Sequence, residues 1–138
     1  MALGCPLLDE LPHRVELDGG IVAVELDVTD EMRGPGGAVH GGLVASLIDC
    51  AGAVAVARAS ARLVATSSSS ISYLAAGRVG PLRAGATAIR IASHHGVADV
   101  RVCDAGHGDR LVASALVTLS FLPGESFTRR VSPGGPPA

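Results

Sequence analysis

The chain has 138 residues, a formal net charge of −2, and a composition that is 48% hydrophobic and 17% charged. It contains no Lys, Asn or Gln, so its 11 basic residues are all Arg. The absence of Lys excludes a Schiff base and a Walker-type phosphate loop. A near-neutral chain with one Tyr, two Phe and no Trp does not suit nucleic-acid binding, which needs a basic face or stacking rings. The length predicts one domain.

The three cysteines, Cys5, Cys50 and Cys103, are odd in number and show no metal-ligand spacing. This usage indicates reduced thiols in a cytoplasmic protein. Residues 1–8 lack the basic residues and the long apolar stretch of a signal peptide. We expect no metal ion and no membrane association.

Two short runs of alternating apolar and polar residues, 14–18 and 21–28, follow an N-terminal segment of residues 1–13. Such alternation is typical of half-buried strands. Asp18-Gly19-Gly20 lies between the runs and suits a hairpin turn, since glycine adopts positive φ without strain. The sequence therefore predicts an antiparallel hairpin.

A glycine-rich loop at residues 33–37 precedes a run with helical spacing from Gly41 to Ala57, whose only charged residue is Asp49. A helix that is apolar nearly all round is buried. The run is short for a membrane span, rich in glycine, and carries a central carboxylate. Because one sheet covers only one side of such a helix, we predict that a second copy of the chain covers the other.

Four further strand-like runs follow, separated by turn residues. They are residues 64–74, 82–93, 97–104 and 111–121. The order of two strands, one long helix and four strands predicts an α+β fold with an antiparallel sheet wrapped around the helix. The domain would span residues 14–122, and residues 123–138, rich in Pro, Gly, Ser and Arg, would form a flexible tail.

Asp49 lies about nine residues into the helix, too far to cap its N-terminus. An ionised carboxylate in apolar surroundings is unfavourable unless it is paired or hydrated. One interpretation is a structural Asp bonded to a backbone amide or to a hydroxyl such as that of Ser46. The other is a catalytic carboxylate, which we favour because the helix is otherwise apolar.

His40-Gly41-Gly42 stands at the start of the same helix. First-turn amides have no intrahelical partner and lie at the positive end of the helix dipole. Glycine lets a ligand approach them closely, so such an end can bind a developing oxyanion. The alternative is a flexible turn in which His40 only caps the helix.

The run Gly37-Ala-Val-His40-Gly41-Gly42-Leu-Val-Ala-Ser-Leu-Ile-Asp49 resembles the signature of hotdog-fold acyl-CoA thioesterases of the PaaI-like type. Thr66-Ser-Ser-Ser-Ser-Ile-Ser-Tyr73-Leu74, then Gly80-Pro-Leu-Arg-Ala and Leu111-Val-Ala-Ser-Ala, resemble the later strands of that family. The resemblance runs from residue 14 to residue 122.

This resemblance implies a hotdog fold and hydrolysis of an acyl- or aryl-CoA thioester without a cofactor. Asp49 would be the general base or the nucleophile, the Gly41 amide would polarise the carbonyl, and His40 would help to hold the carbonyl or the loop. Either Thr66 or Ser67 would position the water. The resemblance also implies an active site at a homodimer interface, and we expect two dimers to form a homotetramer.

One position departs from the family pattern. The family commonly has an Asn or Gln six residues before the His, where this chain has Gly34. Arg33, His40 or an ordered water would have to supply the second hydrogen bond to the thioester. Gly42 and Arg90 are the other candidate substrate-binding residues, and Arg90 would contact the coenzyme A phosphates.

The remaining reactive side chains are interpreted as structural. The run Ser67–Ser70 lacks the Gly-x-Ser-x-Gly pattern of a nucleophile elbow. His94-His95 and His107 have no metal-ligand spacing, Cys50 is interpreted as a small core residue, and Arg129-Arg130 as part of a solvated tail.

Two other functions remain open. One is a module of the same fold that binds an acyl-CoA or acyl-carrier-protein thioester without hydrolysing it; the missing Asn or Gln favours it and Asp49 opposes it. The other is a hydratase or dehydratase, which needs a different arrangement of His and Asp along the helix.

Overall fold

The computed structural model describes residues 2–126. The long helix is α2 (Gly41–Ser60), and the short helical elements are α1 (Pro6–Asp9), η1 (Asp30–Met32) and η2 (Ala105–His107). The strands are β1 (His13–Asp18), β2 (Ile21–Leu26), β3 (Arg62–Tyr73), β4 (Leu82–Ile91), β5 (His95–Asp104) and β6 (Arg110–Ser126). The predicted order of two strands, one long helix and four strands is therefore confirmed.

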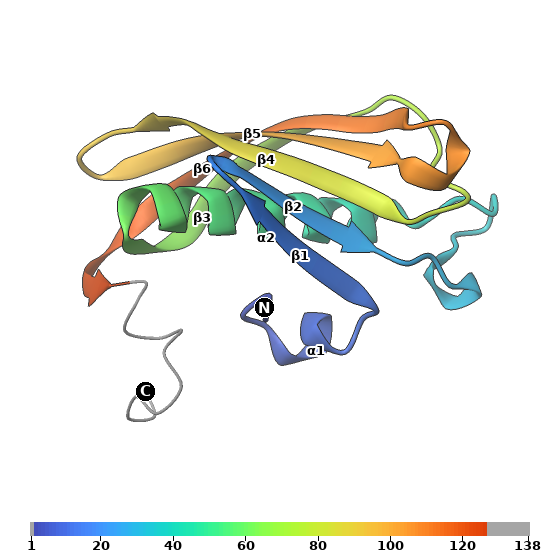
Figure 1. Cartoon of the computed structure of the whole chain (residues 1–138), viewed down its shortest axis with the longest axis horizontal. Coiled ribbons are helices and arrows are strands. Elements are labelled where there is room, and N and C mark those ends of the chain that lie inside the picture. The colour runs from blue at the N-terminus through green and yellow to red at the C-terminus, as the bar shows by residue number, and fades with distance from the viewer. Residues whose placement is uncertain (1, 127–138) are drawn as a thin grey trace.

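The six strands form one antiparallel sheet in the order β1-β2-β4-β5-β6-β3 (Figure 1). Gly19 has a φ of 58° in the turn between β1 and β2, which explains why glycine stands there. Strand β3 follows α2 directly but pairs only with β6, so it forms one edge of the sheet. The predicted α+β architecture is confirmed.

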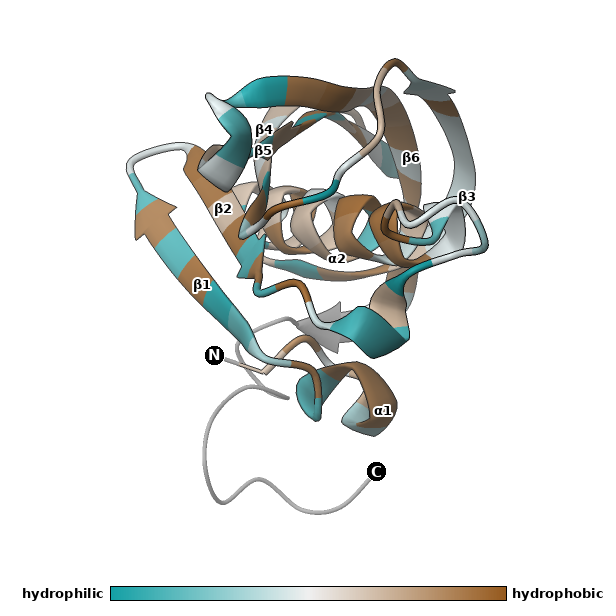
Figure 2. Cartoon of the chain, turned by 90° about the vertical axis from the view of Figure 1, so that its right-hand side faces the viewer, coloured by the Kyte–Doolittle hydropathy of each residue, from teal (hydrophilic) through white to brown (hydrophobic). Residues whose placement is uncertain are grey.

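Helix α2 packs along the concave face of the sheet and contacts β2, β3, β4, β5 and β6 (Figures 1 and 2). Gly52 allows a close approach, because a Cβ there would lie 3.3 Å from the Val117 side chain and 3.5 Å from that of Val100. By length and composition α2 could cross a membrane, with a mean hydropathy of 1.6, but its position against the sheet identifies it as the core helix of this fold.

The side of α2 that faces away from the sheet is covered in part by the N-terminal segment of the same chain. Leu3, Leu8 and Leu11 enclose a small cavity of about 10 Å³ with Leu43 and Leu47 of α2. Figure 1 shows α1 on the opposite side of α2 from the sheet. A second copy of the chain, predicted to cover this side, would therefore add to the cover that the apolar residues of the first 13 positions already give.

The ends of several elements differ from the sequence prediction. Strand β6 continues to Ser126, beyond the expected end at residue 121, because its last residues pair with the start of β3 at Arg62. Helix α1 was not expected; Pro6 opens it, as proline suits the first turn of a helix. Arg129 and Arg130 lie outside the described residues.

Candidate active site at the start of helix α2

The first turn of α2 leaves one backbone amide free. His40 is the N-cap, and its Nδ1 accepts a hydrogen bond of 3.0 Å from the Gly42 N–H. The next two amides, of Leu43 and Val44, donate to the His40 carbonyl at 3.0 and 3.3 Å. Within residues 2–126, the Gly41 N–H has no acceptor. The helix start therefore offers the Gly41 amide, and not that of Gly42, to an incoming anion or carbonyl.

His40 caps the helix, in agreement with one of the two interpretations of the His40-Gly41-Gly42 motif. Because Nδ1 accepts the Gly42 N–H, it carries the lone pair, and the proton of the neutral ring lies on Nε2. The His40 side chain is exposed, so Nε2–H faces outward from the helix start. Capping and donation by His40 are thus compatible.

Arg33 holds the loop in front of the helix and does not reach its start. Its Nη1 donates hydrogen bonds of 2.8 Å to the carbonyls of Gly37 and Arg78, and its Nε contacts Asp30 at 3.2 Å. These contacts direct the Arg33 guanidinium to the loop and not to the position of the missing carboxamide. Gly34, where the family pattern has Asn or Gln, lies beside the His40 ring: a Cβ at Gly34 would be 3.9 Å from His40 Cδ2.

Asp49 is partly exposed and is held by a hydroxyl from the neighbouring strand. Thr66 Oγ1, on β3, donates a hydrogen bond of 2.6 Å to Asp49 Oδ1. Ser46, the structural partner considered from the sequence, donates instead to the Gly42 carbonyl at 2.9 Å. The carboxylate is thus oriented by Thr66 and remains accessible to water.

Ser67 has a different partner, the hydroxyl of Ser120 on β6. The pairing of β3 with β6 shifts register between Thr66 and Ser68, which marks a β-bulge. The structure thus places the Thr66 hydroxyl against Asp49 and the Ser67 hydroxyl against Ser120 of β6.

Gly41 and Asp49 are eight residues apart on one straight helix. A rise of 1.5 Å per residue separates them by about 12 Å along the axis. A nucleophile has to lie within roughly 3 Å of the thioester carbon, and a general base reaches that carbon through one water. The separation along the helix therefore favours a site in which the two groups come from different chains.

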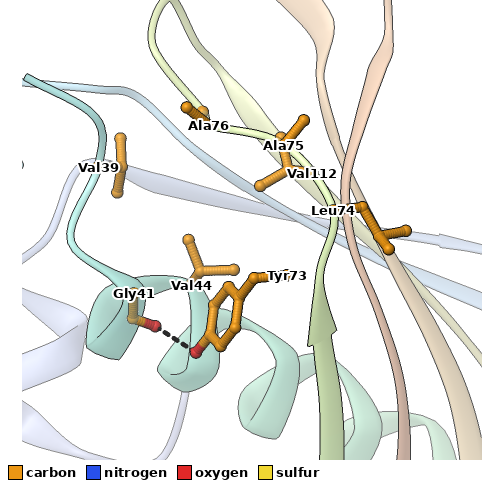
Figure 3. Close-up of a pocket in the computed structure, with 9 residues that line it drawn as sticks. Val39, Gly41, Val44, Tyr73, Leu74, Ala75, Ala76 and Val112 are labelled. Atoms are coloured by element: carbon orange, nitrogen blue, oxygen red, sulfur yellow. Dashed lines mark hydrogen bonds between the residues drawn. The ribbon is translucent and has the colours of Figure 1, made fainter.

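A pocket of about 380 Å³ opens beside the start of α2, lined by Gly41 and by residues at and after the end of β3. Figure 3 shows the Tyr73 ring next to the first turn of the helix, with its hydroxyl directed at the Gly41 carbonyl, to which it donates at 2.8 Å. Sequence reasoning did not identify Tyr73 as a site residue. The available signal was that it is the only tyrosine of the chain.

Arg90 lies far from the Gly41 of its own chain. It sits next to the β4–β5 turn, where Gly96 approaches both the Arg90 carbonyl and the Val56 side chain in the last turns of α2. Gly41 and Val56 are 15 residues apart, about 22 Å along the helix. A role for Arg90 at Gly41 would therefore require a second subunit.

Cys50 is buried, in keeping with its interpretation as a core residue. Burial, followed by the nearby charge of Asp49, raises the pKa of the Cys50 thiol to about 11. The thiol is therefore protonated at neutral pH and is a poor nucleophile. In the described part of the chain, no group of three His, Cys, Asp or Glu side chains is arranged to hold a metal ion.

The sequence profile of the thioesterase superfamily matches residues 36–117, more than half of the chain and the segment that contains Gly41, Asp49 and Thr66. The chain belongs to the thioesterase superfamily. A protein of Halobacterium salinarum, provisionally named an esterase, is 47% identical to this superfamily member over 75 residues. That match covers 51% of this chain and 49% of the Halobacterium protein, so it spans about half the length of this curated relative.

Solved structures of the superfamily share the fold. The Escherichia coli PaaI protein of the phenylacetic acid degradation operon superimposes with a TM-score of 0.79 at 24% identity, over 88% of each chain. A hypothetical thioesterase from Streptococcus pneumoniae, solved with coenzyme A, gives a TM-score of 0.74 at 24% identity over 83% of this chain and 88% of that one. The predicted hotdog fold and the PaaI-like resemblance are confirmed.

Proposed function

We propose that this protein hydrolyses an acyl- or aryl-coenzyme A thioester to the free acid and coenzyme A. The observation that carries the proposal is Asp49, the one carboxylate of an otherwise apolar helix, held by Thr66 at 2.6 Å. Membership of the thioesterase superfamily and the unpartnered Gly41 amide support the same reaction.

The chemistry uses two groups. The thioester carbonyl oxygen accepts a hydrogen bond from the Gly41 N–H, which stabilises the charge that develops on it. As general base, Asp49 takes a proton from water while the water oxygen bonds to the carbonyl carbon; the C–S bond then breaks and the thiolate leaves and is protonated. As nucleophile, Asp49 would bond to the carbonyl carbon while the C–S bond breaks and the thiolate leaves, and water would then cleave the resulting mixed anhydride to the free acid and the Asp49 carboxylate.

The His40 ring, with its Nε2–H donor, lies beside the position of the missing carboxamide. The His40 ring lies beside Gly34 and is oriented by the Gly42 amide. We assign to it the second hydrogen bond to the thioester carbonyl, because Arg33 is engaged by the loop.

The active unit is a homodimer in which Gly41 of one copy works with Asp49 of the other. The separation of about 12 Å within one chain supports this arrangement. Strand β3 supports it: it is an edge strand next to Asp49, so its outer side is free to pair with a second β3. Two such dimers would form a homotetramer. We place the protein in the cytoplasm, since Cys5, Cys50 and Cys103 are free thiols.

The test is release of free thiol from a panel of short, long and aromatic acyl-coenzyme A substrates. Asp49→Asn keeps the size of the side chain and should lower kcat by about a hundredfold or more, because a general base is typically worth 10² to 10⁴. Asp18→Asn, at the exposed end of β1, is the matched control and should be fully active. Hydrolysis by Asp49→Asn at the wild-type rate would contradict the assignment.

A second function, binding of the thioester without hydrolysis, is favoured by Gly34, which leaves the site without its carboxamide. The two functions differ in one measurement. A binding module would retain an acyl-coenzyme A in equilibrium dialysis and release no thiol from any member of the panel.

A further inference from the structure

Tyr73 links the two parts of the site. It is the last residue of β3, and its hydroxyl donates to the Gly41 carbonyl across a sequence separation of 32 residues. Its ring also packs against Gly41: a Cβ at Gly41 would lie 3.5 to 3.6 Å from the ring and hydroxyl atoms. Among the described residues, Tyr73 is the only side chain that hydrogen-bonds Gly41.

This contact matters because Gly41 is the first residue of the helix. The Gly41 amide makes no hydrogen bond within the helix, so the position of Gly41 depends on the contacts that its neighbours make with it. The end of β3 is itself anchored, since the amides of Leu74 and Ala75 both donate to the Val112 carbonyl, at 2.8 and 3.2 Å. Tyr73 therefore ties the amide that would polarise the thioester to the rigid sheet.

The same ring forms one wall of the 380 Å³ pocket. The pocket is otherwise lined by aliphatic side chains and glycines, with Val39 and Val44 on the loop and helix side and Ala75 and Ala76 on the other (Figure 3). None of the described residues that line it carries a charged side chain. A carboxylate buried there would lose its hydration without gaining a partner, whereas an apolar group would gain from leaving water.

We propose that Tyr73 is a positioning and selectivity residue of this site, and that the pocket beside it receives an uncharged acyl group, aliphatic or aromatic. The proposal rests on the proposed thioester hydrolysis. With the carbonyl at the Gly41 amide, the acyl chain enters the pocket along the Tyr73 ring, and acyl groups that end in a carboxylate are rejected.

Two variants separate the hydroxyl from the ring. Tyr73→Phe removes the hydrogen bond to Gly41 and should lower kcat roughly threefold to tenfold, the usual worth of one neutral hydrogen bond, for every acyl-coenzyme A with KM unchanged. Tyr73→Leu also removes the aromatic wall and should change the kcat/KM ratio of benzoyl- to hexanoyl-coenzyme A, which Tyr73→Phe leaves constant. If Tyr73 were merely structural, Tyr73→Phe would keep the wild-type kcat and Tyr73→Leu would keep the wild-type ratio of kcat/KM values for the two substrates.

A matched pair of ligands tests the pocket without turnover. S-hexyl-coenzyme A and S-(5-carboxypentyl)-coenzyme A differ mainly in a terminal carboxylate, and we expect calorimetry to give at least about tenfold tighter binding of the first. The narrowing variant Ala76→Leu should remove most of that preference. Equal affinities for the two ligands would overturn the pocket assignment whether or not the protein hydrolyses thioesters.

The outcomes distinguish this inference from the proposed function. If the wild type releases thiol and Asp49→Asn does not, but Tyr73→Phe and Tyr73→Leu match the wild type, the inference about Tyr73 fails and the proposed function stands. If no substrate is hydrolysed but the S-hexyl ligand binds with the expected preference, the proposed function fails and the pocket assignment stands.

Discussion

Thr66 Oγ1 donates a hydrogen bond of 2.6 Å to Asp49 Oδ1 and so links the edge strand β3 to the middle of helix α2. Within residues 2–126, no other hydrogen bond to the Asp49 carboxylate is found, which leaves Oδ2 for water. A carboxylate fixed by one oxygen and open at the other is suited to hold a water molecule in a constant orientation. The two residues therefore form a unit whose parts can be tested separately.

Thr66→Val removes the hydroxyl and keeps the shape of the side chain. Because Thr66 fixes the orientation of the Asp49 carboxylate, we expect kcat for thioester hydrolysis to fall about tenfold or more, with little change in stability at this exposed position. Thr66→Ser should retain most of the activity. Steady-state thiol release measures both.

Ser67→Ala is the matched control for Thr66→Val, since the adjacent Ser67 hydroxyl bonds Ser120 and not Asp49. It should keep the wild-type kcat. A loss of activity in Ser67→Ala together with a fully active Thr66→Val would show that the wrong hydroxyl has been assigned.

The choice between Thr66 and Ser67 shows where sequence reasoning reaches its limit. Alternating hydrophobicity predicted the strands and the buried helix, because periods of 2 and 3.6 are local properties. Neighbouring strand residues face opposite sides of the sheet, the bulge between Thr66 and Ser68 shifts that alternation, and a run of four serines carries no sign of the shift. The contact between Tyr73 and Gly41 was equally hidden, since it depends on where the end of β3 meets the start of α2.

The cover on the far side of α2 is a further example. The apolar helix predicted a second cover, but composition could not show that Leu3, Leu8 and Leu11 of the same chain supply part of it. The proposed dimer is consequently supported more by the distance between Gly41 and Asp49 than by the apolarity of α2.

Gly41→Pro deletes the amide of the helix start that has no acceptor within residues 2–126. Proline is tolerated at the first position of a helix, and the preceding residue, His40, already has the extended φ of −56° and ψ of 133° that proline requires. We expect the fold to persist and kcat to fall about 10² to 10³ times, the usual effect of losing one oxyanion donor. Gly41→Ala keeps the N–H and adds a methyl group at ordinary contact distance from Tyr73, so it should stay active.

Mixing Gly41→Pro with Asp49→Asn tests whether the site is shared between two copies. A homodimer of either variant lacks the same group, the Gly41 amide or the Asp49 carboxylate, in both of its sites. In the mixed dimer one site combines the intact Gly41 of one copy with the intact Asp49 of the other. Random mixing should therefore restore up to about a quarter of the wild-type activity. Co-expression followed by a thiol-release assay measures the recovery, and complete absence of recovery in a sample shown to contain mixed dimers would mean that each site is built within one chain.

Cys50 should react slowly with alkylating reagents despite its place next to Asp49. Its thiol pKa of about 11 leaves about one thiolate in ten thousand at pH 7, and its side chain is buried. Iodoacetamide should label Cys5 and Cys103, both partly exposed, well before Cys50 in a time course followed by peptide mass spectrometry. Cys50→Ala should keep its kcat, and rapid labelling of Cys50 that abolishes activity would identify it instead as a reactive residue of the site.

Asp104 stabilises the loop that follows the pocket-lining residues Ala75, Ala76 and Gly77. Its carboxylate is fully buried and accepts hydrogen bonds of 2.8, 3.0 and 2.8 Å from the amides of Arg78, Val79 and Gly80. Burial by itself would raise the pKa of the Asp104 carboxyl, but the three amide donors outweigh it and hold that pKa below its usual value. Asp104→Asn turns an NH₂ group toward these donors, so we expect the free energy of unfolding to fall by about 2 to 4 kcal/mol.

The pH dependence of that loss has a definite sign. Because the folded-state pKa of Asp104 lies below the unfolded value of about 3.9, its contribution is complete above that pH and is lost as the pH falls through the folded-state pKa. Urea unfolding should therefore show a constant difference between the wild type and Asp104→Asn from pH 5 to 7 and a narrowing difference below about pH 4. Asp18→Asn, at an exposed position, should match the wild type at neutral pH. A difference between the wild type and Asp104→Asn that widened toward acid would mean that Asp104 is protonated in the folded protein.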